Sequence, residues 1–364
     1  MKLERVSLVS IGHLVPPLEI TSDGIEEELK SVYDRLRLPT GRLQGMSGIR
    51  ARRLWHPKTR LSDCSAESCR LALRAADIAP QEIGCLIHAS VCREYLEPAT
   101  ACRVHHLTGL PQHCWVYDLS NACLGVMNGA VQVAQLIESG AIHAGLVVGT
   151  EDASGLMSAT LNQLQRDGSL TRQSIKPAFA SLTIGSGSCA WLLADTDWLG
   201  SRGLTDAVQL KAAVAIARTE YHELCQSDTD QVGSTMQPIM NTDSEQLLEA
   251  GLKTGLQTFE RLIAELKWTR DELVATVCHQ VGGAHRRRML ETLGLPVERD
   301  FATFEDLGNT GSVALPTALA KACQSGFLPQ AGRCALLGIG SGVNSLMIGL
   351  ELGALQVASA MQRN

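Results

Sequence analysis

Apolar residues recur along this chain in two patterns. Short apolar runs predict buried strands, and a stripe that repeats about every 3.6 residues predicts an amphipathic helix. The predicted strands are residues 6–11, 83–90, 115–119, 144–149 and 189–193, followed by 212–217, 274–278, 303–306 and 334–339. The predicted helices are residues 62–76, 123–137, 244–266, 284–293 and 313–325. Strands that alternate with helices in this way are typical of a layered α/β fold.

The chain repeats one design twice. A strand-like run at 117–119 passes through a polar elbow into a helix that closes at Ser139-Gly140, and the segment 304–311 leads in the same order to Ser325-Gly326. Self-similarity of this kind indicates a duplicated unit. Two related halves packed about a pseudo-twofold axis would direct both elbows toward one central pocket.

Interruptions of the apolar pattern predict where the halves meet. Glycine and polar residues break the pattern at 195–205. We therefore predict an N-terminal half at residues 1–197 that carries the nucleophile, and a C-terminal half at residues 198–364. A second polar stretch, 226–244, predicts a mobile loop or an insertion.

Composition narrows the class of protein. The chain has 364 residues, of which 45% are hydrophobic, and a formal net charge of -6, so it is long enough for sizeable cores and offers no basic surface for nucleic acid. Its twelve cysteines form no CxxC pair and its first residues lack the apolar core of a signal peptide, which predicts reduced thiols in the cytoplasm. The apolar region 334–361 is broken by glycine and polar residues, so we expect no membrane span. The histidines and cysteines of 102–114 match no closed zinc pattern, so we expect no metal site.

Cys123 is the candidate nucleophile. It lies in Asn121-Ala122-Cys123, where the strand-like run turns into the predicted helix. The partial positive charge at a helix N-terminus favours the thiolate, the form of cysteine that attacks carbonyl carbon. The alternative interpretation is a small buried hydrophobic residue, which is what most cytosolic cysteines are.

His279 and Asn309 supply the remaining chemistry at two further strand-to-helix junctions. In the duplicated design Asn309 holds a place near that of Cys123. A neutral imidazole and a carboxamide each donate a hydrogen bond to a thioester oxygen and so stabilise an enolate next to it. The alternatives are a histidine satisfied by the backbone and an asparagine that merely suits a tight turn.

The glycine-rich segment 337–343 is a candidate oxyanion site. It lacks the lysine of a phosphate-binding loop and a following acidic ribose partner. Glycine lets the backbone approach a ligand closely. We therefore expect the backbone N–H groups around Gly340, Ser341 and Gly342 to complete an oxyanion hole with the N–H of Cys123.

Four motifs occur in one order: Asn-Ala-Cys at 121–123, His-Gln at 279–280, Gly-Asn-Thr-Gly at 308–311 and Gly-Ile-Gly-Ser-Gly at 338–342. In this order they resemble the thiolase superfamily, specifically its ketoacyl-acyl-carrier-protein synthase III group. Residues 48–55 and 94–100 further resemble the OleA-type enzymes of bacterial head-to-head olefin biosynthesis. The resemblance extends over essentially the whole chain. It implies a five-layered αβαβα fold built from two pseudo-repeat halves, and a homodimer.

The resemblance also implies roles for individual residues. Cys123 is the acylated nucleophile, and His279 with Asn309 positions the thioester and its oxyanion. Glu97 precedes Pro98 where ordinary synthase III enzymes carry an apolar residue that reaches into the neighbouring subunit's acyl tunnel. In the OleA-type enzymes a glutamate here is the proposed base, and poor solvation in a tunnel would raise its pKa. The alternative is that Glu97 forms a surface salt bridge.

The implied reaction is a non-decarboxylative Claisen condensation of two fatty acyl-CoA molecules. One acylates Cys123, and a second, deprotonated by Glu97 of the partner subunit, attacks the acyl-cysteine to give a 2-alkyl-3-oxoacyl-CoA that is later hydrolysed. The resemblance places Arg50, Arg52 and Arg53 near the CoA entrance, although three such arginines are as often a solvated patch. No cofactor is expected beyond the CoA of the substrates, and downstream pathway enzymes are expected partners.

The sequence is also compatible with three other functions. A decarboxylating synthase III would extend an acyl-cysteine with malonyl-acyl-carrier protein and would not need Glu97. A non-catalytic partner would bind acyl groups without using its Cys, His and Asn residues. A thioesterase-like hydrolase would replace the carbon nucleophile by water. The sequence departs from many synthase III enzymes at Ser186-Gly187-Ser188, where they have Asp-Gly-Ala, and we expect this change to affect packing only.

Overall fold

The computed structural model describes residues 1–227 and 240–361. Ten of the strands in these residues form a large mixed sheet that consists of two similar halves. The N-terminal half contains β1 (Val6–Val15), β4 (Cys85–His88), β5 (Trp115–Asp118), β6 (Ala144–Glu151) and β7 (Gly187–Asp195). The C-terminal half contains β8 (Val208–Ala217), β11 (Leu273–Cys278), β12 (Gly332–Gly340) and β13 (Asn344–Leu352). The last strand, β14 (Gln356–Met361), pairs in parallel with β1.

The two halves repeat the same strand order. The N-terminal half runs β5-β4-β6-β7-β1 and the C-terminal half runs β11-β12-β13-β8. In both, a parallel pair (β4 with β6, β11 with β12) is followed by two antiparallel pairs. Where the N-terminal half has β5, the described part of the C-terminal half has an isolated parallel bridge between Thr276 and Asp300. The halves join where Ser7 and Leu8 of β1 pair with Gln209 and Val208 of β8.

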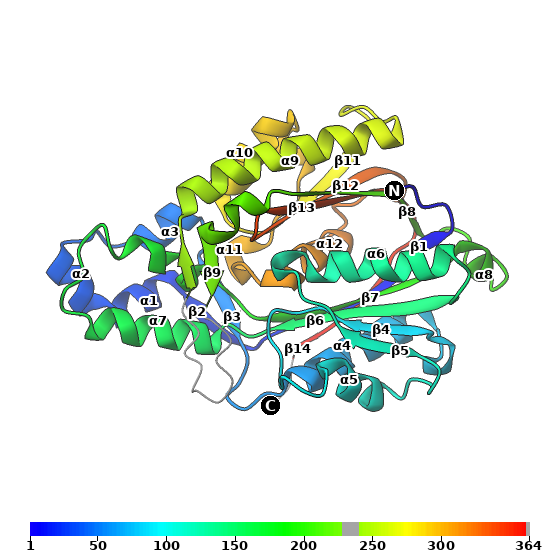
Figure 1. The fold of residues 1–364 in the computed structure, drawn as a ribbon, viewed down its shortest axis with the longest axis horizontal. Helices are drawn as coiled ribbons and strands as arrows, with labels where there is room; N and C mark the ends of the chain where they lie inside the picture. The colour runs from blue at the N-terminus through cyan, green and yellow to red at the C-terminus, as the bar shows by residue number, and fades with distance from the viewer. Residues whose placement is uncertain (228–239, 362–364) are drawn as a thin grey trace.

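Helices cover both faces of each half-sheet (Figure 1). The outer helices of the N-terminal half are α4 (Leu61–Ala76) and α5 (Thr100–Thr108), and those of the C-terminal half are α9 (Ser244–Leu266) and α10 (Gly283–Leu293). The helices α6 (Gly125–Glu138) and α12 (Ala314–Gln324) lie between the half-sheets. Alternate residues of each strand show this layering, because neighbouring side chains of a strand point to opposite faces.

Strands β4 and β12 illustrate the alternation. Ile87 of β4 and Leu336 of β12 belong to the central cluster together with the apolar faces of α6 and α12. Their neighbours point outward: Leu86 joins the cluster under α4 and α5, and Leu337 joins the cluster under α9 and α10. The result is the five-layered αβαβα arrangement that the family resemblance implies.

A smaller lobe projects from one end of the sheet, at the left of Figure 1. It contains α1 (Ser22–Glu28), α2 (Lys30–Leu36), α3 (Arg42–Ser47), α7 (Ser154–Arg166) and the antiparallel pair of β2 (Leu18–Thr21) with β3 (Ala51–Leu54). The buried side chain of Glu26 accepts hydrogen bonds from the N–H groups of Gly41 at 2.6 Å and Leu43 at 2.7 Å, and from the hydroxyl of Tyr33 at 3.2 Å. One carboxylate thus fixes the turn into α3.

The predicted strand at 303–306 is wrong. Residues Phe304–Leu307 form the short helix α11, because Phe304 and Leu307, three residues apart, are both buried. The side-chain oxygen of Gln280 accepts hydrogen bonds from the N–H groups of Thr303 and Phe304 at 2.7 and 3.2 Å and so replaces an N-cap.

The predicted boundary and loop fall at two connections. Residues 195–205 contain the short helix α8 (Thr196–Gly200) between β7 and β8. The polar stretch begins and ends in the small paired strands β9 (Cys225–Ser227) and β10 (Met240–Thr242). The rest of that prediction, residues 228–239, lies outside the described residues. Within 1–227 and 240–361, no helix has both the length and the apolar character needed to cross a membrane.

Candidate active site

Cys123 lies in a tight turn between β5 and α6. The turn is the 3₁₀ segment η2 (Ala122–Leu124), so the α-helix begins two residues after Cys123 and not at it. Ala122 has a positive φ of 44°, which is uncommon for a residue with a side chain. A backbone held this way at a strand-to-helix junction fixes where the following thiol points.

The second half contains the same turn with different residues. The segment η7 (Gly311–Val313) precedes α12 as η2 precedes α6, and Gly311 has a positive φ of 57° like Ala122. The repeat therefore aligns Ser312 with Cys123. Asn309 is near this position, as predicted, but three residues before it.

The thiol of Cys123 is not a resting thiolate, which corrects the expectation from the helix N-terminus. Burial, and next the negative charge of Glu151, raises the pKa of Cys123 to about 12. Loss of hydration disfavours the charged form more than the helix end favours it. The thiol must therefore lose its proton as it attacks the acyl group.

The pH dependence of alkylation measures the pKa of Cys123 directly. Because the pKa of Cys123 is near 12, the rate of its carbamidomethylation by iodoacetamide in the free protein is expected to rise about tenfold per pH unit between pH 7 and pH 10, as the thiolate fraction does. Peptide mass spectrometry distinguishes Cys123 from the other cysteines. The urea-unfolded chain is the control, and its Cys123 should level off near the ordinary thiol pKa. A plateau below pH 8 in the folded protein would contradict the buried thiol.

The glycine turn after β12 lies beside the nucleophile. A Cβ atom placed on Gly340 would be 3.7 Å from the backbone nitrogen of Cys123. The side-chain nitrogen of Asn344 donates to the carbonyl of Ser341 and to the side-chain oxygen of Asn121, each at 3.3 Å. The turn that contains Gly342 is thus tied to the nucleophile's own loop. The oxyanion role of Gly340, Ser341 and Gly342 stays a prediction, with this proximity in its favour.

His279 follows β11 directly and is 4% exposed. Its backbone N–H donates to the carbonyl of Leu337 at 3.0 Å, which places it beside β12. Burial, and next the proximity of His285, lowers the pKa of His279 to about 3. The ring is therefore neutral at physiological pH and retains one N–H to donate, as the predicted role requires. The Nδ1 atom is buried and has no partner among the described residues.

His285, on the first turn of α10, is a residue that the sequence analysis missed. Burial lowers its pKa to about 4, so the ring is also neutral, and its Nδ1 atom has no partner within the described part of the chain. The sequence feature that could have indicated His285 is its position six residues after His279, at the start of a predicted helix. Two neighbouring imidazoles disfavour protonation of each other, which helps to keep His279 neutral.

Asn309 is held by the backbone on both sides. Its N–H donates to Thr183 at 3.0 Å and its carbonyl accepts from Gly185 at 2.9 Å. Its side-chain oxygen accepts from the N–H of Gly311 at 3.1 Å. The NH₂ group is therefore the part of the carboxamide that remains to donate to a ligand.

Cys123, His279 and Asn309 lie on or next to elements that pack against one another. The turn η2 with Cys123 contacts both η7, which follows Asn309, and β12. Strand β12 in turn pairs with β11, which His279 follows. The structure thus brings the three predicted residues to the central region, where the two halves meet. Among the described residues, no group of three or more histidine, cysteine or carboxylate side chains is arranged for a metal ion.

Glu97 lies on the loop between β4 and α5 and is exposed in the single chain. The loop is anchored at both ends. At its start, the N–H groups of Val91 and Cys92 donate to Glu151 at 3.0 and 3.2 Å. At its end, the N–H groups of residues 100 and 101 donate to Asp118 at 2.8 Å each. Whether Glu97 enters a second subunit's tunnel stays a prediction.

The three arginines differ in their surroundings. Arg52 is fully buried, donates to the hydroxyl of Ser22 at 3.1 Å, and has its pKa lowered to about 10 by burial. The predicted CoA contact of Arg52 is therefore wrong, since CoA cannot reach it. Arg50 and Arg53 reach the surface, but both pair with Glu19, at 3.3 and 2.6 Å. Their CoA role stays a prediction and would require these pairs to open.

A buried ion pair supports the His279 region. Asp300 accepts from the Nε of Arg286 at 2.6 Å and from the N–H of Cys278, the residue before His279, at 3.0 Å. The Asp300 side chain is fully buried. Burial raises the pKa of Asp300, and Arg286 opposes that rise.

Replacing Arg286 should leave this buried carboxylate without its partner. We expect Arg286→Ala to lower the free energy of unfolding by about 3 kcal/mol in urea titrations. The loss should be larger at pH 8 than at pH 5, because Asp300 takes up a proton at low pH. Arg288→Ala, which breaks an exposed pair with Glu249, should cost less than about 1 kcal/mol. Equal effects of the two changes would contradict the role of the buried pair.

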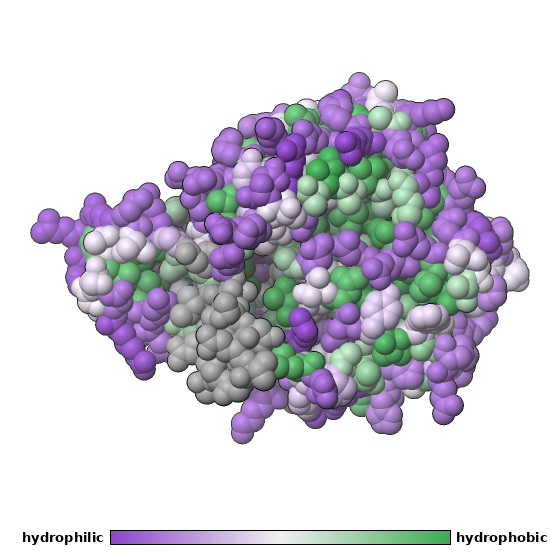
Figure 2. Space-filling model, viewed as in Figure 1, coloured by the Kyte–Doolittle hydropathy of each residue, from purple (hydrophilic) through white to green (hydrophobic). Residues whose placement is uncertain are grey.

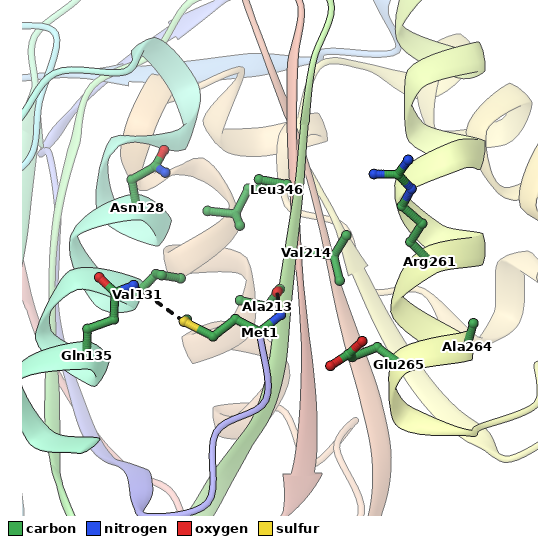
Figure 3. A pocket seen from close by; sticks show the side chains of 11 residues that line it. Met1, Asn128, Val131, Gln135, Ala213, Val214, Arg261, Ala264, Glu265 and Leu346 are labelled. Carbon is green, nitrogen blue, oxygen red and sulfur yellow. Dashed lines mark hydrogen bonds between the residues drawn. The ribbon is translucent and has the colours of Figure 1, made fainter. Parts of the chain in front are cut away.

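A groove opens between α6, β8 and α9, with a volume of about 690 Å³ (Figure 3). Hydrophobic side chains gather here on the face shown in Figure 2. Its lining includes Val131, Val214, Ala264 and Leu346, with Arg261 and Glu265 at its α9 side. None of the predicted catalytic residues lines it.

Two family models match the chain. One is described as the N-terminal domain of thiolase and matches residues 46–185. The other is described as the C-terminal domain of 3-oxoacyl-[acyl-carrier-protein] synthase III and matches residues 263–350. The two matches fall in the two halves of the sheet.

Individual relatives match over nearly the whole chain. The acyl-CoA:acyl-CoA alkyltransferase of Shewanella oneidensis is 36% identical over 354 residues, which is 96% of this chain and 100% of the relative. A serine-for-cysteine variant of Xanthomonas campestris OleA, solved with lauric acid and lauroyl-CoA, is 34% identical with a TM-score of 0.88, over 96% of this chain and 99% of that one. A Xanthomonas oryzae structure described as 3-oxoacyl-(acyl carrier protein) synthase III is also 34% identical, with a TM-score of 0.89, over 96% and 100%. The chain therefore belongs to the thiolase superfamily and, within it, to the family of acyl-CoA:acyl-CoA alkyltransferases.

Proposed function

We propose that this protein is an acyltransferase that condenses two fatty acyl-CoA molecules, without decarboxylation, into a 2-alkyl-3-oxoacyl product. The observation that carries the proposal over a decarboxylating reaction is Glu97, a carboxylate on an exposed loop whose ends are anchored to Glu151 and Asp118. A decarboxylating synthase generates its carbon nucleophile by loss of CO₂ and needs no such base. The relatives named alkyltransferase support the same choice.

In the first step the sulfur of Cys123 attacks the thioester carbon of one acyl-CoA. The C–S bond to CoA breaks, and the thiol proton ends on the CoA thiol that leaves. The N–H of Cys123 and the neighbouring Gly340 turn would receive the developing oxyanion. Because the pKa of Cys123 is raised, proton loss and attack should occur together.

In the second step the carboxylate of Glu97 removes a proton from the α-carbon of the second acyl-CoA. The enolate oxygen would accept hydrogen bonds from neutral His279 and from the NH₂ group of Asn309. The enolate carbon then forms a C–C bond with the acyl carbon on Cys123, whose C–S bond breaks. The proton held by Glu97 returns to the thiol, so the protein ends in its starting state.

A homodimer would bring Glu97 to the neighbouring site. Strand β5 ends the sheet, and its Trp115 is 61% exposed. Leu96 beside Glu97 is 57% exposed, and Tyr95 is exposed as well. Exposed apolar side chains next to a free strand edge favour contact with another chain. Burial of this surface would also exclude water from around Glu97.

The substrates would supply the only cofactor, since CoA enters with each acyl group. A cytoplasmic location fits the twelve free cysteines, and enzymes that take up the 3-oxoacyl product would be partners.

Product analysis tests the proposal. Purified protein is given myristoyl-CoA alone, and products are identified by mass spectrometry. A 2-alkyl-3-oxo product with twice the number of acyl carbons supports non-decarboxylative condensation. Product and CO₂ only after addition of malonyl-acyl-carrier protein would show the decarboxylating reaction. Free myristate alone would indicate a hydrolase, and no turnover would indicate an acyl-binding partner.

A further inference from the structure

Glu151, the last residue of β6, is a buried carboxylate with no part in the proposed chemistry. Its Oε1 atom accepts from the N–H of Val91 at 3.0 Å, from the N–H of Ser312 at 3.3 Å, and from the Ser312 hydroxyl. Its Oε2 atom accepts from the N–H of Cys92 at 3.2 Å. A buried carboxylate costs free energy unless such donors offset its lost hydration.

The donors come from two segments of different function. Ser312 lies in η7, three residues after Asn309, and a Cβ placed on the intervening Gly311 would be 3.2 Å from the side chain of Glu151. Val91 and Cys92 begin the loop that carries Glu97. One side chain therefore joins the residue that would hold the enolate to the loop that would supply the base.

The duplicated turns relate the contact between Ser312 and Glu151 to the position of the nucleophile. Ser312 occupies the position that Cys123 occupies in the first half, as the positive φ angles of Gly311 and Ala122 show. One turn thus presents a nucleophile, and its counterpart bonds to Glu151. The charge of Glu151 also acts on Cys123, where it raises the pKa of the thiol.

We propose that Glu151 is a positioning residue for the condensation step, which aligns the Asn309 turn and the start of the Glu97 loop through these four hydrogen bonds. The inference rests on the proposed condensing function. The proposal predicts different effects on the two steps: acylation of Cys123 does not need this alignment, whereas condensation does.

The test is Glu151→Gln, which keeps the size of the side chain and removes its charge and one acceptor oxygen. Condensation of myristoyl-CoA should fall about 10- to 100-fold in kcat, because small misplacements of reacting groups have effects of this size. Acylation of Cys123, followed by intact-protein mass spectrometry after one turnover, should be retained. Alkylation of Cys123 at pH 8 should become faster, by about threefold per unit by which its pKa falls.

Ser312→Ala is the second variant. It retains Glu151 and removes only the hydroxyl contact to the Asn309 turn, so it should lower condensation to a smaller extent without speeding alkylation. Glu298→Gln, at an exposed glutamate of the 3₁₀ turn Val297–Arg299, is the matched control and should behave as wild type. Melting temperatures of all variants show whether they are folded.

The outcomes distinguish this inference from the proposed function. Wild-type protein that forms no condensation product refutes the proposed function itself. If wild type condenses, a parallel loss of acylation and condensation in both variants shows a purely structural role for Glu151 and overturns the inference. Undiminished condensation in Glu151→Gln overturns it as well. If Glu151→Gln does not fold, Ser312→Ala decides: selective loss of condensation supports the inference, and wild-type condensation rejects it.

Discussion

Cys123→Ala should abolish both the acyl-enzyme and the condensation product. Without the sulfur there is no atom to carry the first acyl group, and the rate of product formation should fall by at least about a thousandfold. Wild-type protein mixed with a slight excess of myristoyl-CoA should gain the mass of one acyl group, and the variant should gain none. Product is measured in parallel by mass spectrometry of the organic extract.

The other cysteines provide the control for this experiment. Cys102 on α5 is exposed, and Cys102→Ala should leave acylation and condensation unchanged. An acyl adduct that persists in Cys123→Ala but disappears in Cys102→Ala would show that the wrong cysteine has been assigned. Because Cys123→Ala removes only the sulfur atom, the fold should stay intact, which far-ultraviolet circular dichroism checks.

Glu97→Gln should separate the two steps. Acylation of Cys123 needs no carboxylate at residue 97 and should be retained, whereas condensation should fall about 10²- to 10⁴-fold, the usual contribution of a general base. The expected result is a stable acyl-enzyme with free CoA released and little product. A variant that condenses at the wild-type rate would leave the reaction without its proposed base.

Mixed dimers test whether Glu97 acts across the subunit boundary. Chains that carry Cys123→Ala and chains that carry Glu97→Gln are inactive separately but, when co-expressed, can form one site with both residues intact. Statistical mixing in a twofold dimer should then restore about a quarter of the wild-type sites. Restoration supports action in trans. A mixture that stays inactive, although heterodimers are shown by two different affinity tags, would place Glu97 in its own subunit's site.

Much of the fold could be predicted because the chain has a regular pattern. The strands at 144–149, 189–193 and 334–339 are continuous apolar runs, which is what a strand covered by helices on both faces requires. The helix at 244–266 shows an apolar stripe and ends at Leu266 as predicted. The motifs around Cys123 and His279 could be found because they follow the parallel strands β5 and β11, where such strands place functional side chains. Asn309 follows the short helix α11 instead, and its motif and its place in the duplicated design indicated it.

The remaining features depend on contacts that no local pattern contains. The segment 303–306 has strand-like residues, but Gln280, more than twenty positions earlier, caps it as a helix. In the sequence Arg52 has the pattern of a surface arginine, but in the structure the lobe covers its side chain completely. The pKa of Cys123 depends on burial and on Glu151, which comes from another strand, so the local helix end alone gave the opposite direction.

The central position of α6 and α12 determines how the chain can fold. Each half-sheet has one face covered by its own outer helices, and the other face rests on a layer to which both halves contribute one helix. The N-terminal segment joins the two half-sheets: Ser7 and Leu8 pair with Gln209 and Val208, Lys2 forms a bridge with Ala212, and β1 pairs with the C-terminal strand β14. A half expressed alone would expose an apolar sheet face to water and should not be stable. The duplication therefore describes the origin of the two halves and does not make them independent folding units. We expect the whole chain to unfold in a single cooperative transition.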